Sequence, residues 1–393
     1  MNNGMRIALL ALACFATSIS EFAIVGMLDV VAESVGVSVA MAGQLLTAFA
    51  ISGAIGVPLV SMALSKLDSR DVMTVSLALV VAGCVLTVVV SNFHLMMVSR
   101  VLMAIGSGVF AVSCFVIAPQ MAKEGRQASS IATVTLGFNV AMVLGLPFSR
   151  FMVQVLPWTA VFWVVALASA VMIPVIRAIV PRSRVEAPVP LREQLGYLGR
   201  PTILLPLALN LFWCSGYAAL YSYVSPFLED VASLNSATLS TVLLLFSVST
   251  LVGSKLGGWL CDRFSLYPVI ISALAAQILI LGALLVLNGP AWIVTGAVLV
   301  WGVFAWVPAS IINLAVIKAA PEVARITLSL KNSSTQVAYA LGAGVGGIVV
   351  SGFGTRMLCL LSAVFLALAI MLCRIAAKQE RRTDTDSVVT ALA

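Results

Sequence analysis

The sequence has few charged residues and a single histidine. Only 9% of its 393 residues are charged, whereas about a quarter are charged in an ordinary soluble domain. His94 alone cannot form an HExxH metal site, and the seven cysteines show no CxxC spacing, so we expect no metal site and no disulfide framework. No G-x-x-x-x-G-K-[ST] motif and no segment large enough for a soluble catalytic domain is present. We therefore expect a protein that is not an enzyme and uses no cofactor.

Long apolar runs occupy most of the chain, which is 61% hydrophobic. An α-helix needs about 20 apolar residues to cross the hydrocarbon core of a bilayer. Twelve runs of this length predict an all-α integral membrane protein with twelve transmembrane helices. The predicted helices lie at about residues 5–28, 37–64, 71–91, 94–120, 128–154, 159–180, 202–228, 237–260, 267–288, 291–317, 325–352 and 356–377.

The basic residues are distributed unevenly between the two ends of these helices. If the N-terminus is cytoplasmic, only Arg100, Arg150 and Arg356 of the 22 Lys and Arg residues fall toward the outer side. Because cytoplasmic loops retain Lys and Arg, we expect both termini in the cytoplasm. The net charge of +7 then reflects topology, and we expect no nucleic-acid partner.

A short motif occurs twice, half a chain length apart. Gly258-Trp259-Leu260-Cys261-Asp262-Arg263 ends one apolar run, and an altered copy, Ser61-Met62-Ala63-Leu64-Ser65-Lys66, ends an earlier one. Internal duplication is common in transporter folds. We therefore predict two six-helix halves, at residues 1–180 and 202–377. A cytoplasmic linker at 181–201 would join them, and a cytoplasmic tail would follow at 378–393.

Three further stretches carry a resemblance to known transporters. Ser20–Leu28 resembles the Thr-Glu-Phe-x-x-x-Gly-Leu-Leu opening of drug and sugar efflux proteins, and Ala141–Pro147, followed by Arg150, resembles their helix 5 antiporter motif. Tyr221–Phe227 resembles the end of their helix 7. Together with the repeated Gly-x-Leu-x-Asp-Arg motif, these stretches resemble the major facilitator superfamily. Within this superfamily the chain resembles the drug:proton antiporter branch, and in particular the bacterial sugar-efflux and arabinose-efflux-like permeases.

The resemblance implies a function. It implies a multi-pass transporter of the bacterial inner membrane that exports small molecules, sugars or drugs, from the cytoplasm by alternating access. Protons would enter in exchange, so that the proton gradient drives antiport and drug resistance could result. We expect a monomer in the lipid bilayer. A purine nucleoside exporter and a proton-coupled uptake permease remain alternatives, and a non-transporting membrane sensor is an alternative of a different class.

Two residues are candidates for proton coupling. Glu21 is the only acid inside the first predicted helix, and a carboxyl group in a low-dielectric region favours its neutral form, so it can bind and release a proton as its access to water changes. Arg100, with Gly106 and Gly108 two turns later, resembles the family's helix 4 arginine motif and could tune Glu21. The alternatives are a neutral carboxyl kept for packing and an arginine that extends to the lipid headgroups.

Two further groups are candidates for gating and helix packing. Asp262 and Arg263, with Gly258 and the altered position Lys66, could hold the cytoplasmic side closed through charge interactions at helix ends; an ordinary loop charge is the alternative. In the helix 5 motif, small residues and a proline suit close packing and a local kink, while Arg150 could be a gate residue or an interfacial anchor. The residues of that motif are Gly137, Gly145, Pro147 and Arg150.

Polar and aromatic side chains inside three predicted helices are candidates for the substrate cavity. Four of them recur at the spacing of one helix face in the seventh helix. Their hydrogen-bonding tips suit sugars, nucleosides and flat drugs alike, and a packing stripe is the alternative. The seventh helix contributes Asn210, Trp213, Tyr217 and Tyr221, the fifth contributes Asn139, and the eleventh contributes Asn332 and Gln336.

Overall fold

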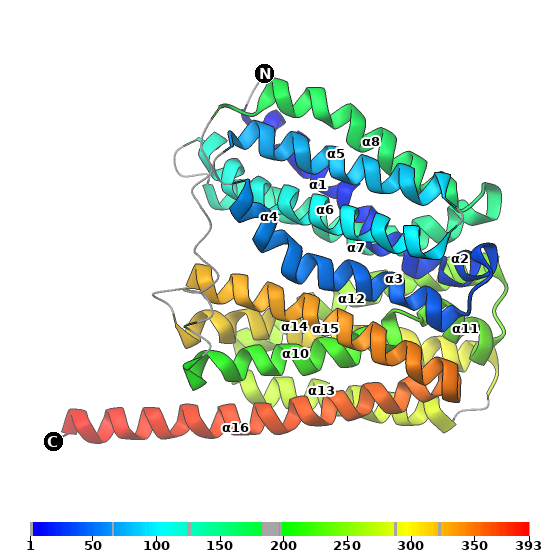
Figure 1. Cartoon of the computed structure of the whole chain (residues 1–393). Coiled ribbons are helices and arrows are strands. Elements are labelled where there is room, and N and C mark those ends of the chain that lie inside the picture. Colours follow the sequence, from blue (N-terminus) through cyan, green and yellow to red (C-terminus); the bar gives the residue numbers. More distant parts are fainter. Residues whose placement is uncertain are drawn as a thin grey trace. The chain divides into compact units, whose positions relative to one another are not determined.

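The computed structural model describes residues 3–64, 67–90, 92–123, 127–182, 196, 199–286, 289–320 and 324–392. Within these ranges, twelve helices are long and apolar enough to cross a membrane (Figure 1). They match the twelve apolar runs of the sequence one by one. The predicted all-α fold with twelve transmembrane helices is therefore confirmed.

Seven helical segments form the first six spans. The second span is not a single α-helix, because its two α-helical parts are joined by a π-helical turn at Ser52–Gly56. Pro58, just after this turn, has no N–H to donate to the preceding turn, which accounts for the change in hydrogen-bonding pattern. The segments are α1 (Asn3–Gly26), α3 (Val39–Ile51), α4 (Val57–Ala63), α5 (Ser69–Val89), α6 (Phe93–Met121), α7 (Gln127–Val155) and α8 (Thr159–Ile179).

Six helices form the remaining spans. Each follows from a long apolar run, and several contain an internal proline that membrane helices tolerate. Most of the predicted linker at 181–201 lies outside the described residues. The helices are α10 (Pro201–Tyr221), α12 (Ser236–Arg263), α13 (Leu266–Val286), α14 (Ala291–Ala319), α15 (Ala324–Phe353) and α16 (Leu358–Leu392), with a 3₁₀ turn at Thr355–Met357 before α16.

Two short helices connect consecutive spans. The sequence predicted a loop at the first position and the end of the seventh span at the second. α2 (Leu28–Val35) follows α1, and α11 (Val224–Ala232) follows α10. Gly36 ends α2 in the left-handed conformation, with φ of 69°, which glycine adopts at little cost. Asp29 consequently lies in the first turn of a helix, where the helix dipole favours a negative charge.

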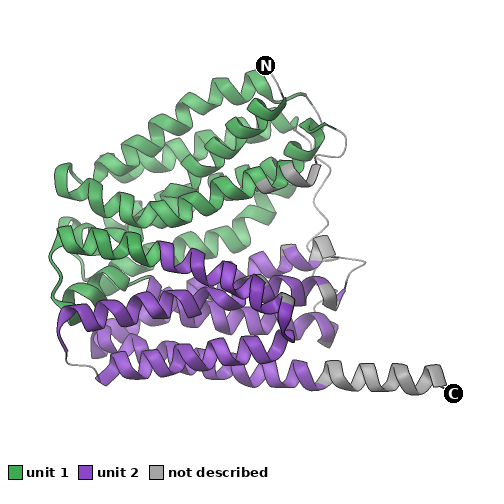
Figure 2. Ribbon diagram, turned by 180° about the vertical axis from the view of Figure 1, so that it is seen from behind, with its two compact units in different colours: residues 1–190, 222–247 green, residues 191–221, 248–393 purple. Residues whose placement is uncertain are grey.

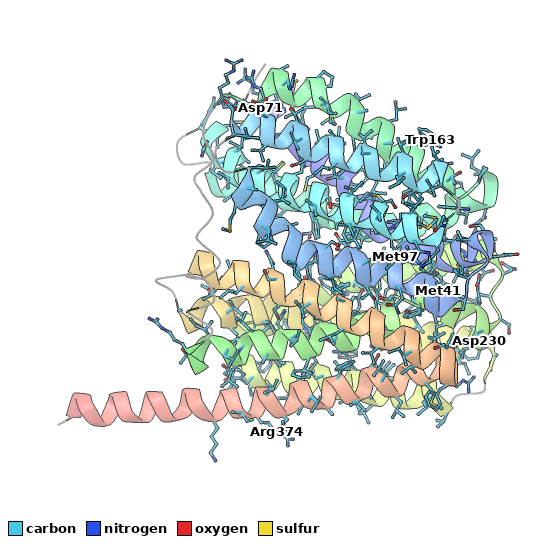
Figure 3. The ribbon with its side chains drawn as sticks, viewed as in Figure 1. Met41, Asp71, Met97, Trp163, Asp230 and Arg374 are labelled. Carbon is cyan, nitrogen blue, oxygen red and sulfur yellow. The ribbon has the colours of Figure 1, made fainter. Side chains whose placement is uncertain are left out.

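The chain forms two compact units (Figure 2). Unit 1 contains residues 1–190 and 222–247, and unit 2 contains residues 191–221 and 248–393. The segment 222–247, which includes α11 and the start of α12, therefore packs with the first six spans, although it follows the seventh span in the sequence. Within unit 1, α2 and α11 lie at the same end (Figure 1). Met41 and Asp230 are also at this end, and Asp71 is at the other (Figure 3).

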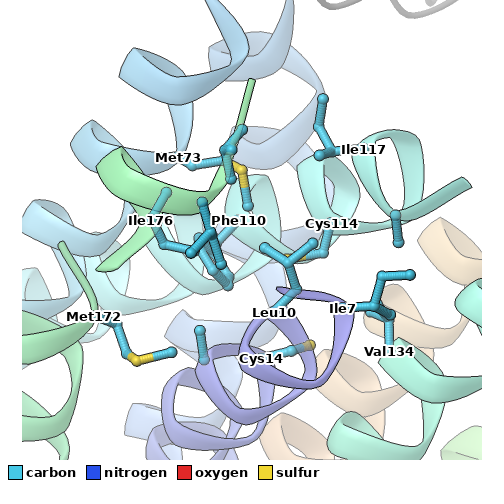
Figure 4. Packing of buried hydrophobic residues seen from close by; sticks show 14 of the residues in the cluster. Ile7, Leu10, Cys14, Met73, Phe110, Cys114, Ile117, Val134, Met172 and Ile176 are labelled. Carbon is cyan, nitrogen blue, oxygen red and sulfur yellow. The ribbon is translucent and has the colours of Figure 1, made fainter. Parts of the chain in front are cut away.

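The apolar core of unit 1 is built from α1, α5, α6, α7 and α8 (Figure 4). Leu10, Phe110 and Ile176 are fully buried there. In a bilayer the lipid tails are as apolar as these side chains, so close van der Waals packing holds the helices together more than the hydrophobic effect does. The core therefore depends on shape complementarity between neighbouring helices.

α1 and α7 approach each other closely in unit 1. A Cβ atom placed on Gly137 would lie 2.2 Å from the backbone oxygen of Ala11, and one on Gly145 would lie 2.9 Å from Cβ of Phe22. On the α1 side, a Cβ on Gly26 would lie 2.3 Å from the backbone oxygen of Leu146. The glycines of the helix 5 motif thus allow two backbones to touch, as the sequence interpretation requires.

Candidate functional site

Arg150 is the centre of a charged cluster in unit 1. Its guanidinium donates a hydrogen bond of 2.6 Å to Oδ2 of Asp29 on α2 and another to Oε1 of Glu229 on α11. The same guanidinium lies 3.3 Å from Oγ of Ser236, the first residue of α12. We call Asp29, Arg150, Glu229 and Ser236 the Arg150 cluster. One side chain of α7 therefore binds three elements that are far from it in the sequence.

Neighbouring contacts support the same arrangement. Nε2 of Gln154, one turn after Arg150, donates to the backbone oxygen of Ser236 at 3.2 Å and also to Oγ of Ser240. Oγ of Ser225 on α11 donates to the backbone oxygen of Val25 at 3.1 Å. The Tyr223 ring packs directly against Gly43 of α3, where a Cβ atom could not fit. The segment 222–247 is thus held to α1, α3 and α7 by polar and packing contacts.

The charges of the Arg150 cluster do not cancel. The Arg150 side chain is only 1% exposed, whereas those of Asp29 and Glu229 are 20% and 30% exposed. Oδ1 of Asp29 and Nε of Arg150 are buried without a hydrogen-bond partner among the described residues. Burial and the adjacent Asp29 carboxylate raise the pKa of Glu229, and Arg150 only partly offsets them. One cation and two carboxylates give the cluster an excess negative charge, which favours the binding of a proton.

The sequence analysis named Arg150 but not its partners. Asp29 and Glu229 lie 121 and 79 residues from Arg150, so no local pattern connects them. One signal was available, because both acids follow directly on apolar runs in a chain with few charges. An arginine at the end of another run is the natural counter-ion for such acids.

Arg100 lies beside the residue that precedes Glu21. Its Nη1 donates a hydrogen bond of 3.0 Å to the backbone oxygen of Ser20, and its guanidinium carbon lies 4.7 Å from the centroid of the Phe162 ring. The side chain is 1% exposed, and its Nε and Nη2 have no partner among the described residues. Arg100 is therefore an interior arginine and does not extend to the surface of unit 1. Glu21 is half-buried on α1.

The predicted gating motif lies at the end of α12. The guanidinium of Arg263 is exposed and lies 4.3 Å from the centroid of the Trp259 ring, and the space around Gly258 is open. Lys66 and the side chain of Asp262 lie outside the described residues. The gating role of the motif stays a prediction.

The helix 7 stripe faces the interior of unit 2. The amide nitrogen of Asn210 donates to Oγ1 of Thr335 at 3.0 Å, and Nε1 of Trp213 donates to the backbone oxygen of Ala305 at 3.0 Å. Tyr217 stacks on Tyr221 with a centroid distance of 4.9 Å and is 2% exposed. The stripe packs on α14 and α15, and its predicted role in substrate binding remains a prediction.

The other cavity candidates have different surroundings. Asn139 and Asn332 are exposed, and Gln336 is half-buried on α15. Pro147 is buried inside α7. The structure thus brings together the four helix 7 residues within unit 2 and places Arg100 next to the α1 segment that carries Glu21.

Replacing Asn210 by leucine is expected to lower the free energy of unfolding by about 1–2 kcal/mol, because a buried donor to α15 is lost. Replacing the exposed Asn332 of α15 by leucine is the matched control and should change it by less than about 0.5 kcal/mol. Thermal unfolding of the purified protein in detergent measures both. Equal shifts for the two variants would contradict a structural role of Asn210.

Comparison with known proteins places the chain in a family. Residues 10–329 match the family model of the Major Facilitator Superfamily. The chain is 33% identical over 373 residues to the MFS-type transporter YbcL of Bacillus subtilis (strain 168), covering 94% of this chain and 95% of the relative. It is 26% identical over 375 residues to the inner membrane transport protein YdhP of Escherichia coli (strain K12), covering 95% and 96%.

A solved structure shows the same fold. The structure of a bacterial homologue of the human lysosomal transporter Spinster, in an inward-facing and unoccupied conformation, matches with a TM-score of 0.75 at 14% identity, covering 96% of this chain and 97% of that chain. Together, the spans and these matches define a multi-pass membrane transporter. The chain belongs to the Major Facilitator Superfamily, as the sequence motifs indicated.

Proposed function

We propose that this transporter exports a small molecule across the bacterial inner membrane in exchange for protons, with both termini in the cytoplasm. Glu21 is the proton carrier in this proposal, and the transport cycle is alternating access. The observation that carries it is the buried Arg100 guanidinium, bonded to the carbonyl group one residue before Glu21. An ionisable side chain inside a membrane span is commonly accompanied by an interior charge of opposite sign, and Arg100 lies beside this part of α1.

The direction and the substrate class rest on other support. Resemblance of Ser20–Leu28 and Ala141–Pro147 to efflux motifs favours export. The aromatic and amide side chains of α10 favour a substrate with both flat apolar faces and hydrogen-bonding groups, such as a sugar or a drug. A purine nucleoside fits the same description and is the second candidate. Monomeric function in the bilayer is part of the proposal.

Proteoliposomes with imposed proton gradients test the proposal. With an acidic interior, protons flow outward, so an antiporter should accumulate the substrate in the vesicle, whereas an uptake permease should accumulate it only with an acidic exterior. The panel contains pentoses, purine nucleosides and cationic drugs. Failure of every compound to move under either gradient would favour a non-transporting role.

Replacing Glu21 by glutamine is expected to reduce gradient-driven accumulation at least about tenfold while substrate binding is kept, because glutamine cannot release a proton. Asp71→Asn is the matched acid-to-amide control, since Asp71 is exposed at the other end of unit 1. Accumulation of radiolabelled substrate and binding by calorimetry are measured on both variants. Unchanged accumulation in Glu21→Gln would overturn the role of Glu21.

A further inference from the structure

The Arg150 cluster contains two carboxyl groups for one cation. With both carboxylates ionised, Asp29 and Glu229 repel each other across a shared guanidinium that is itself 1% exposed. With both protonated, Arg150 would be buried without a counter-ion, which is strongly unfavourable. With one proton, the cluster is neutral and every contact to Arg150 can be kept, because a protonated carboxyl group still has an acceptor oxygen.

We propose that Asp29 and Glu229 form a second proton-binding site, which holds one shared proton while Arg150 binds both side chains. Two carboxyl groups that lie close together can share one proton, because this avoids the repulsion between two negative charges. The raised pKa of Glu229 agrees with this assignment, and its causes are burial and the Asp29 carboxylate. The unpartnered Oδ1 of Asp29 is a further acceptor in the cluster.

The ion pairs of the cluster join Arg150 to Asp29 and Glu229, and the elements packed around it carry further charged residues. Glu33 on α2 and Asp230 on α11 are exposed acids. α1 carries Glu21 near its C-terminal end, and α6 carries His94 and Arg100, of which Arg100 binds the backbone oxygen of Ser20. Neither α3 nor residues 236–247 of α12 contain a charged residue.

The proton decides how firmly the segment 222–247 is attached to α1, α2 and α7. Glu229 has a raised pKa while it is attached and returns toward its ordinary value when α11 separates. The bound proton therefore stabilises the attached arrangement fully at pH values below the ordinary pKa of a glutamate. This stabilisation is lost as the pH rises through the raised pKa that Glu229 has while α11 is attached. Release of the proton weakens the attachment, and binding of a proton restores it.

This inference rests on the proposed proton-coupled transport for its physiological role, but the site can be tested without transport. Hydrogen–deuterium exchange of residues 222–235 is followed in the purified full-length protein from mildly acidic to alkaline pH, corrected for the intrinsic exchange rates. We expect the corrected exchange of this segment to rise several-fold toward alkaline pH, while residues 69–89 of α5 show no such rise.

Substitutions then identify the groups responsible. Glu229→Gln and Asp29→Asn each mimic one neutral carboxyl group, so both should keep the low exchange at alkaline pH and lose the pH dependence. Glu33→Gln and Asp230→Asn are matched controls on the same helices and should keep the dependence of the wild type. Persistent pH dependence in Glu229→Gln and Asp29→Asn, or none in the wild type, would overturn the proposal.

A direct measurement covers the case in which a variant does not fold. Infrared spectra of the wild type should show a protonated carboxyl band that disappears as the pH rises together with the increase in exchange. Glu21→Gln should retain both changes. Loss of both in Glu21→Gln would assign the proton to Glu21 and refute this site, whereas failure of gradient-driven transport with both changes intact would refute only the proposed function.

Discussion

Replacing Arg150 by methionine is expected to lower the free energy of unfolding by about 3–5 kcal/mol. The substitution keeps a long side chain but leaves the Asp29 and Glu229 carboxyl groups facing each other without a cation, and breaking a buried ion pair by removing one partner is strongly destabilising. The loss should be larger at alkaline pH, since both carboxylates are then ionised. Thermal unfolding in detergent at two pH values measures it.

Arg177 provides the matched control for this prediction. It forms an ion pair of 3.7 Å with Asp71, but the two side chains are 59% and 54% exposed. Water screens such a pair, so Arg177→Met should change the free energy of unfolding by less than about 1 kcal/mol. If Arg150→Met and Arg177→Met shift the unfolding temperature equally, the buried cluster does not stabilise unit 1.

Replacing Gly137 by alanine is expected to destabilise the protein by about 1–3 kcal/mol, and by valine more strongly. The added Cβ would lie 2.2 Å from the backbone oxygen of Ala11, so α1 and α7 must separate. Overpacking of a tight contact has effects of this size. The measurement is again thermal unfolding in detergent, together with the yield of folded protein.

Gly282→Ala is the control for the effect of alanine on a helix. The space around Gly282 of α13 is open, so no clash results. Alanine favours the helix by about 0.5–1 kcal/mol over glycine. Gly282→Ala should therefore be neutral or stabilising. Destabilisation of the same size in both variants would show that the close approach of α1 and α7 is not the cause.

The sequence predicted those features that depend on local composition. Twelve apolar runs specified twelve spans, and the repeated and antiporter-like motifs indicated the family. Gly137 and Gly145, which the sequence marked as suited to close packing, lie where α1 and α7 approach each other. In each case the signal is contained within one stretch of chain, because span length and small-residue spacing are properties of a single helix.

The candidate site was only partly predictable. Arg100 was identified, but its burial beside Ser20 and Phe162 was not, since an arginine near a span end can equally extend to the headgroups. Tyr217 and Tyr221 were identified as one helix face, but the face itself does not tell whether it lines a cavity or packs on α14 and α15. Asp29 was assigned to a loop and lies in α2.

The sequence by itself determined the spans, the all-α membrane architecture and the superfamily, because hydropathy and motif spacing are local. Only the tertiary structure decided that Arg150 binds Asp29 and Glu229, and that residues 222–247 pack with the first six spans. These three charges come from separate helices, and Asp29 and Glu229 lie 121 and 79 residues from Arg150. Their pairing depends on how the helices pack, since a buried cation lowers its energy through whichever carboxylates the fold brings within reach.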